Sequence, residues 1–320
     1  GRIPGSNIIA TMTDKPLNLL LITSDQQHWN TLGCLNSEIE TPNLDRLAQE
    51  GTLFERAYCP NPTCTPTRAS IITGKYPSQH GAWSLGTKLP ESETTMGDVF
   101  QAAGYDVSLL GKAHFQQLRT TDAFPSLESY PKMQDLDFWR NFHGPFYGFN
   151  HIETARNHAD EPHVGQHYAV WMEEQGLQDW RKHFQNTFQE FDFTEGGPVQ
   201  EPQEHRWSIP EDYHYNRWIA DRTCARIDEA GKQEKPFFCW ASFFDPHPPY
   251  LAPEPWDTMY DPAQVTVPQA HPGEHDKNPP HFQKTQEADP DFREWEGEYS
   301  SHGMHSHRHD RGKLAKDIAE

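Results

Sequence analysis

Groups that could act on an anion occur at four places in the sequence, each beside an element that could hold them in position. Three apolar stretches indicate strands and are each followed by polar side chains, and the fourth place is the start of a helix. The carboxyl ends of parallel strands meet at one edge of an open α/β sheet, where ligands bind. Two histidines, a lysine and an arginine beside a cation would form a site there for a tetrahedral oxyanion. The groups are Asp25 and Gln26 after residues 17–23, Lys112 and His114 after residues 105–110, Asp245 and His247 after residues 236–244, and Cys64 with Arg68 at the helix start.

The candidate nucleophile is Cys64, which opens the stretch C-T-P-T-R-A-S-I-I-T-G over residues 64–74. Pro66 suits the first turn of a helix, where its missing N–H has no partner, and Gly74 suits the residue that ends a helix. We therefore expect Cys64 just before a helix N-terminus, where backbone N–H groups and the helix dipole favour an anion. Arg68, one turn into the helix, could reach the same anion. The alternative is a buried structural cysteine before an ordinary helix.

The pattern C-x-P-x-R followed by A-S-x-x-T-G resembles the signature of the type I sulfatases, which belong to the alkaline phosphatase superfamily. In that family the cysteine is oxidised after translation to formylglycine, and the hydrated aldehyde is the nucleophile. The resemblance therefore implies that Cys64 becomes formylglycine. It also implies a partner, either a formylglycine-generating enzyme or an anaerobic maturation enzyme.

The first apolar stretch, residues 17–23, indicates a strand buried on both faces, as in a parallel sheet. Asp25 and Gln26 follow it, and their oxygens suit a divalent cation. By itself, Asp25 would be better explained as a helix cap than as a metal ligand. Sulfatases begin in a similar way, with a strand that ends in Asp-Asp or Asp-Gln. The resemblance implies that Asp25, Gln26 and the group formed from Cys64 bind a metal, with Ca²⁺ first and Mg²⁺ or Mn²⁺ as alternatives.

Two further motifs extend the resemblance. G-K-x-H implies that Lys112 contacts formylglycine and the sulfate, and that His114 hydrogen-bonds the formylglycine hydroxyl. D-P-H-x-P-Y implies that His247 contacts the sulfate ester near the leaving group, so that Lys112 and His247 both bind substrate. Without the resemblance, a surface lysine and a structural histidine would explain the first motif. Leu85 departs from the family, because many sulfatases have an asparagine at that point.

The implied chemistry is hydrolysis of a sulfate monoester of a carbohydrate or an aryl alcohol. One hydroxyl of the hydrate attacks sulfur, and His247 assists departure of the alcohol. His114 or a nearby base then takes the proton of the second hydroxyl, which expels sulfate and regenerates the aldehyde. Arg68 and Lys112 orient the nucleophile and the anion.

Two alternatives stay open. A phosphonate monoester or phosphodiester hydrolase of the same superfamily would share formylglycine and Asp-Gln, although Lys112 and His114 favour a sulfatase, because that group tends to have Tyr and Thr there. A non-catalytic sulfatase-like fragment or pseudoenzyme would only bind an anion or a partner.

The elements that must position these groups indicate an α/β fold. The resemblance implies an alkaline-phosphatase-like, mostly parallel central sheet with helices on both faces. The apolar pattern and capping residues predict helices over residues 41–51, 94–104 and 213–227, with Leu44 and Leu47 of the first facing inward. Cys224 of the third is expected to face the core.

We expect residues 1–14 to be a tag scar and an extension, and residues 15–320 to be an incomplete N-terminal catalytic domain. Within it, about 120–235 reads as an irregular insertion without catalytic residues, and about 251–310 as a surface excursion. Four histidines close together there could bind a transition metal or simply be a solvated loop. They are His302, His305, His307 and His309.

Sulfatases carry a second metal half-site, a second active-site lysine and a small C-terminal domain, and nothing in the sequence matches them. The family's C-terminal part is therefore expected to be absent. We expect the 320-residue chain alone to be inactive and to hold its cation weakly.

The net charge of −20 argues against nucleic acid or an anionic membrane as a partner, and no apolar run is long enough to span a bilayer. Five cysteines without a C-x-x-C pair are too few for a disulfide scaffold. The compartment stays open, with a periplasmic or secreted location favoured and no signal peptide in the sequence.

Overall fold

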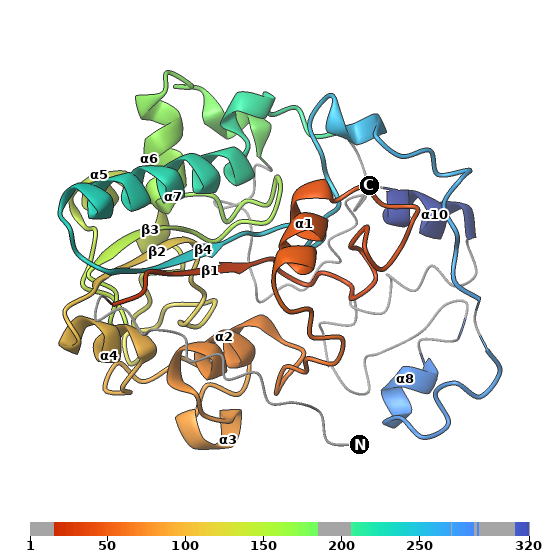
Figure 1. Cartoon of the computed structure of the whole chain (residues 1–320), viewed down its shortest axis with the longest axis horizontal. Coiled ribbons are helices and arrows are strands. Elements are labelled where there is room, and N and C mark those ends of the chain that lie inside the picture. The colour runs from red at the N-terminus through yellow and green to blue at the C-terminus, as the bar shows by residue number, and fades with distance from the viewer. Residues whose placement is uncertain (1–15, 185–205, 270, 285–286, 288–310, 320) are drawn as a thin grey trace, which may run out of the picture.

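A computed structural model describes residues 16–319 apart from 185–205, 270, 285–286 and 288–310. Its centre is a four-stranded, entirely parallel sheet in the order β1-β4-β2-β3 (Figure 1). The strand ends are level, because Thr23 pairs with Ser242, Ser242 with Gly111, and Lys112 with Ala155. The polar residues that follow the strands therefore meet at one edge. The strands are β1 Leu19–Thr23, β2 Asp106–Lys112, β3 His151–Ala155 and β4 Phe237–Ser242.

Helices cover both faces of this sheet (Figure 1). One face carries α2 Cys64–Thr73, α3 Pro77–His80 and α4 Met96–Ala102, and the other carries α6 Gln166–Glu174 and α7 Tyr215–Lys232. Helix α5 Leu136–Asn141 packs against α6. The remaining helices are α1 Pro42–Glu50, α8 Pro280–Lys284, α10 Arg311–Ala319 and the short 3-10 helices Lys132–Gln134, Trp180–His183, Glu211–Tyr213 and Trp256–Thr258. None of the described helices is long and apolar enough to cross a membrane.

Two apolar clusters hold the layers together, one on each face of the sheet. Adjacent residues of β4 belong to different clusters, because side chains along a strand point alternately to opposite faces. Trp240 packs with Ile72 and Leu109 in one cluster, whereas Ala241 packs with Trp218 in the other. Burial of each large apolar side chain contributes roughly 1.5–3 kcal/mol to stability.

The expectation that residues 17–23 are buried on both faces is wrong. β1 is an edge strand that pairs only with β4 among the described residues, and its side chains are largely exposed. Leu20 is 45% exposed and Ile22 55% exposed. An apolar run predicts a strand, but neighbouring chain is needed to bury it.

Two helix faces were also predicted wrongly. α1 begins after Thr41 and ends before Gly51 as expected, yet it has no buried residue, and Leu44 and Leu47 are exposed. On α7, Trp218 and Ile219 are buried, whereas Cys224, which was expected to face the core, is exposed. A periodic pattern shows which residues share a face, and packing decides whether that face is covered.

The stretch expected to be irregular, residues 120–235, holds strand β3 and helices α5, α6 and α7. β3 reads H-I-E-T-A, so its polar composition hid it from a search for apolar runs. It nevertheless pairs along its whole length with β2.

Candidate active site

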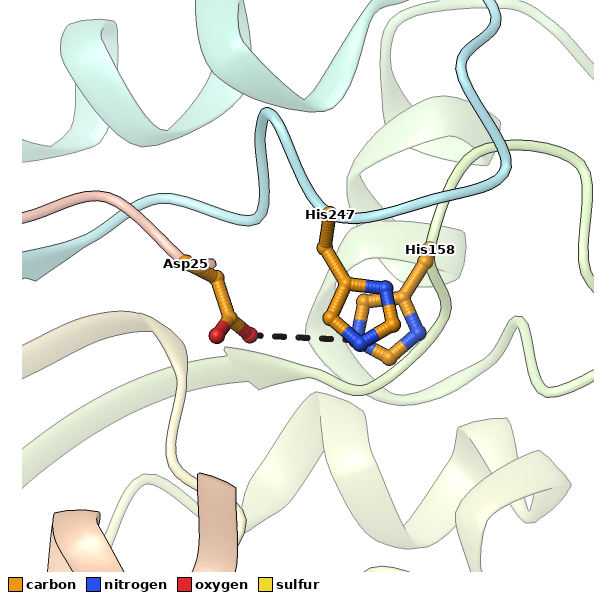
Figure 2. A group of neighbouring side chains, drawn as sticks. All are labelled: Asp25, His158 and His247. Carbon is orange, nitrogen blue, oxygen red and sulfur yellow. Dashed lines mark ion pairs between the residues drawn. The ribbon is translucent and has the colours of Figure 1, made fainter. Parts of the chain in front are cut away.

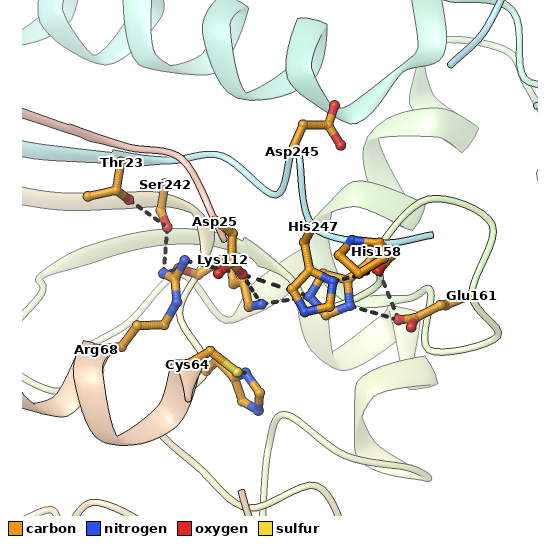
Figure 3. Close-up of polar contacts among 12 residues, drawn as sticks. Thr23, Asp25, Cys64, Arg68, Lys112, His158, Glu161, Ser242, Asp245 and His247 are labelled. Atoms are coloured by element: carbon orange, nitrogen blue, oxygen red, sulfur yellow. Dashed lines mark hydrogen bonds and ion pairs between the residues drawn. The ribbon is translucent and has the colours of Figure 1, made fainter. Parts of the chain in front are cut away.

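The carboxyl edge of the sheet brings together nearly all of the predicted site residues (Figure 3). Asp25 follows β1, Lys112 ends β2, and His247 follows the turn after β4. Cys64 approaches the same place from α2. These segments lie far apart in the sequence, and the parallel register of the strands is what places them side by side.

Helix α2 forms as its sequence predicts. Thr63 is the extended N-cap residue and Gly74 ends the helix in the left-handed conformation with φ 67°. Cys64 is the first residue of the helix rather than the residue before it, a shift of one position. Its Sγ lies 3.1 Å from Nδ1 of His114.

Arg68 lies one turn further along α2 and is buried. Its Nη1 donates to the backbone oxygen of Lys112 at 2.8 Å and to Oγ of Ser242 at 2.7 Å. Its Nη2 lies 3.6 Å from Oδ2 of Asp25. Arg68 therefore ties α2 to the ends of β2 and β4, and its positive charge faces the centre of the site.

Asp25 is the negative centre of this network. Burial alone would raise its pKa, but the positive charges of Lys112 and Arg68 outweigh that effect and lower the pKa to about 2. Its Oδ2 accepts from the fully buried Lys112 ammonium. The carboxylate is therefore ionised at neutral pH.

His114 is buried and neutral, because burial and then the charges of Lys112 and Arg156 hold its pKa well below the usual range. Its backbone is left-handed, with φ 54°. The buried carboxylate of Glu128 accepts from the backbone N–H groups of His114, Phe115 and Gln116, at 2.5, 2.8 and 2.9 Å. The unusual backbone that aims His114 at Cys64 is thus held by an internal carboxylate.

His158, which was not predicted, completes the cluster. It follows β3 by three residues, and its Nε2 lies 2.6 Å from Nζ of Lys112. Figure 2 shows its ring against that of His247; the ring centroids are 3.6 Å apart and the planes are inclined by 8°. Burial and then the Lys112 charge hold the pKa of His158 well below its usual range. The available signal was a histidine just beyond a strand, but that strand is polar.

A cavity of about 540 Å³ borders Asp25 at this edge of the sheet, whereas Lys112, His114 and His158 do not line it. Cys64 and His247 both border it. Gln26, which is exposed and has a left-handed backbone, borders it beside Asp25. Leu85 also borders it, so the departure from the family's asparagine falls at the site. Other residues along its wall are Ser24, Cys59, Asn61, Thr67, Arg68 and Trp240.

A second cavity, of about 380 Å³, lies on the other side of His247, which borders both. Its polar members include Asp245, whose carboxylate accepts from Tyr215 Oη and from Asn216 Nδ2, each at 2.5 Å. Asp245 is thus turned away from the Cys64 cavity. Other residues along this wall are Glu211, His214, Arg217, Tyr250 and Trp256.

The donor atoms fit a hard cation better than a transition metal. The ionised Asp25 and the amide of Gln26 offer oxygens at the Cys64 cavity, and oxygen is the ligand that Ca²⁺ and Mg²⁺ prefer. Asp25, His158 and His247 also have ligand atoms within 4.8 Å of one another. However, Lys112 Nζ already contacts Asp25 and His158. The four histidines at residues 302–309 lie outside the described residues.

Comparison with known proteins agrees with these motifs. A family model described as Sulfatase matches residues 17–281. An uncharacterized sulfatase of Escherichia coli is 28% identical over 237 residues, which are 74% of this chain and 39% of that protein. An arylsulfatase of Clostridium perfringens is 29% identical over 255 residues, 78% of this chain and 47% of that protein. The chain thus spans less than half the length of these curated relatives.

The fold also has solved counterparts. A phosphonate monoester hydrolase from Silicibacter pomeroyi superposes with a TM-score of 0.61 at 22% identity, over 95% of this chain and 57% of that one. At that identity the likeness concerns the fold alone. It confirms the expected alkaline-phosphatase-like, mostly parallel sheet flanked by helices.

Proposed function

Because the chain belongs to the sulfatase family of the alkaline phosphatase superfamily, we propose that it forms the sulfate-binding and nucleophile-bearing part of a sulfuric ester hydrolase. One observation carries the proposal. Cys64 at a helix start contacts His114 and borders the same cavity as His247 and the ionised Asp25, which pairs with Lys112 at the sheet edge. Such an arrangement suits the tetrahedral anion of a sulfate ester. We also propose that residues 15–320 belong to the catalytic domain of this family.

The nucleophile would be formylglycine, which a maturation enzyme makes from Cys64. The hydrate of this formylglycine would supply the attacking hydroxyl. Asp25 and Gln26, together with the group at position 64, would hold a divalent cation, Ca²⁺ in our proposal and Mg²⁺ or Mn²⁺ as alternatives. When bound, such a cation neutralises charge that develops on the sulfate oxygens.

The protein's own residues would each have a separate role in the reaction. Lys112, a neighbour of Asp25 and fully buried, would bind a sulfate oxygen, and Arg68 would hold α2 and Asp25 in register. His247, on the wall shared by the two cavities, would act in its protonated form and give the Nε2 proton to the departing alcohol oxygen as the sulfur–oxygen bond breaks. His114 would take the proton of the second hydroxyl when sulfate leaves.

The cavity beyond His247 would receive the alcohol. Trp256 offers an exposed ring, and Oδ1 of Asn216 is a buried acceptor with no hydrogen-bond partner among the described residues. Glu211 and Asp245 make the wall rich in acceptors. We therefore propose an aryl or carbohydrate alcohol, and we expect a polysulfated chain to be disfavoured because its charges would face these carboxylates.

The first test replaces the nucleophile. In the longer protein, with formylglycine at position 64 confirmed by mass spectrometry, Cys64→Ala should lower kcat on 4-nitrophenyl sulfate at least about 10³-fold. Cys224→Ala, which changes an exposed cysteine on α7, is the matched control and should leave kcat unchanged. Full turnover by Cys64→Ala would contradict the proposed nucleophile.

The same assay separates the alternatives. A phosphonate monoester hydrolase would turn over an aryl phosphonate faster than the aryl sulfate. A non-catalytic protein would turn over neither, even with formylglycine in place.

A further inference from the structure

His158 contacts Lys112 and His247, two groups that the proposed reaction would use, and Glu161 contacts His158 (Figure 3). We propose that they are a positioning pair, which sets Lys112 and His247 at the distance and orientation that the sulfate ester requires. This inference rests on the proposed function. It assigns a role to a segment beyond β3 in which the sequence indicated no catalytic residue.

The hydrogen bonds of His158 define the orientation of its ring. Oε2 of Glu161 accepts from the backbone N–H of His158 at 3.1 Å and lies 2.9 Å from its Nδ1. A carboxylate only accepts, so Nδ1 carries the proton. Nε2 then offers a lone pair to Lys112 Nζ at 2.6 Å, and an ammonium only donates. The partners therefore dictate the tautomer.

Lys112 is thereby held from two sides. Asp25 contacts its ammonium from the end of β1, and His158 contacts it from the end of β3. Lys112 itself has no exposed surface. Because three strands supply these groups, the ammonium has little freedom to move when substrate enters.

His247 is held by the ring face of His158. The two imidazoles are almost parallel, and their centroids are 3.6 Å apart. Nδ1 of His247 lies 2.5 Å from the backbone oxygen of Pro248, which leaves Nε2 as the edge for the ester. One residue thus supports two groups that follow different strands, β2 and β4.

His158 is a positioning residue rather than a catalytic one. Its side chain is 12% exposed, and it is missing from the described residues that border the two cavities. A role as a metal ligand beside Asp25 and His247 would require Lys112 to leave its present partners.

The activity test uses two substrates that differ in leaving group. Assistance to the alcohol matters more for phenyl sulfate than for 4-nitrophenyl sulfate, because phenoxide is the poorer leaving group. His158→Ala should lower kcat/KM for both, and by about 10-fold more for phenyl sulfate. Glu161→Ala should act in the same direction, and Glu161→Gln, which keeps an acceptor oxygen, should restore most of the rate.

The matched control is His167→Gln. His167 is also a buried histidine beside β3, and it accepts from the N–H of Thr154 at 2.9 Å, away from the site. Its replacement should lower stability without changing the ratio of the two rates. Equal losses on both substrates in His158→Ala would reduce His158 to a purely structural residue and overturn the inference.

A second measurement does not depend on turnover. In NMR spectra of the 320-residue chain, the His247 ring protons should move when His158→Ala removes the stacked ring, and His158 should show the Nδ1–H tautomer. Unchanged His247 shifts would overturn the inference, as would Zn²⁺ binding that His158→Ala abolishes. If the longer wild-type protein turns over neither ester, the proposed function fails, and the spectra alone decide the positioning role.

Discussion

Strands β1 and β2 look alike in sequence and differ in the fold. Both come from short apolar runs, and both end in a group of the candidate site, Asp25 or Lys112. β2 lies between β4 and β3, with helices on both faces, and Leu109 is fully buried. β1 has β4 as its one neighbour among the described residues, and Leu20 is 45% exposed. An apolar run therefore identifies a strand and the chemistry at its end, while the surrounding chain decides how firmly that end is held.

The candidate site also has groups that are held by buried partners and groups that are exposed. On the side of β2, β3 and β4, carboxylates hold Lys112, His158 and the backbone of His114, although the carboxylate that contacts Lys112 comes from the end of β1. Asp25 serves Lys112, Glu161 serves His158, and Glu128 holds the backbone of His114. On the side of β1, Gln26 is exposed and borders the open cavity. The rigid side suits an anion that must be oriented, and the open side is where the oxygens for a cation lie.

The largest expected effect tests the two strands directly. Leu109→Ala leaves a cavity in the cluster under the sheet and should lower the free energy of unfolding by about 2–5 kcal/mol. Leu20→Ala on β1 is the matched control, and exposed positions usually change stability by at most about 0.5 kcal/mol. Urea unfolding of both variants gives the comparison. Similar losses would mean that β1 is buried in solution.

A somewhat smaller effect tests the internal carboxylate. Glu128→Gln replaces one of the two oxygens that receive three backbone N–H groups and should cost about 3 kcal/mol of stability. The exposed Glu38 also accepts hydrogen bonds, from Thr266, so Glu38→Gln is the control and should be nearly neutral. In the active protein the loss should extend to kcat, because the backbone that aims His114 at position 64 would relax. A wild-type kcat in Glu128→Gln would mean that the backbone conformation of His114 does not affect the reaction.

The smallest effect concerns pH. Burial would raise the pKa of Glu153 on β3, but hydrogen bonds from His151 and Arg222 outweigh it and lower the pKa from 4.5 to about 2. A depressed folded pKa gives stability that is present above pH 4.5 and lost as the pH falls toward 2. Glu153 should therefore contribute up to about 3 kcal/mol to an acid-dependent loss of stability. Between pH 6 and 2 the free energy of unfolding of Glu153→Gln should change less with pH than that of the wild type. Equal pH dependence in the two proteins would exclude Glu153 as a cause of the acid-dependent loss.

The sequence predicted those site residues whose positions follow from local sequence patterns. Cys64 and Arg68 lie on one helix turn, and Lys112, His114 and His247 each follow an apolar strand, so local pattern and the shared edge of parallel strands bring them together. Glu128, His158 and Glu161 were missed for a different reason. They lie in irregular chain or beyond the polar β3. Glu128 bonds to a residue 12 positions away and His158 to one 46 positions away, and Glu161 takes its role only from His158.

The sequence by itself determined strands β1, β2 and β4, the helix at Cys64 and the groups at the ends of those three strands. These depend on apolar runs, Pro and Gly punctuation and local hydrogen bonds, which act within about ten residues. Only the tertiary structure decided that β1 lies at an edge and that Arg68 ties two strands together. It alone placed His158 between Lys112 and His247. The reason is physical: burial and ion pairing depend on which distant segments pack together, and no local pattern records that choice.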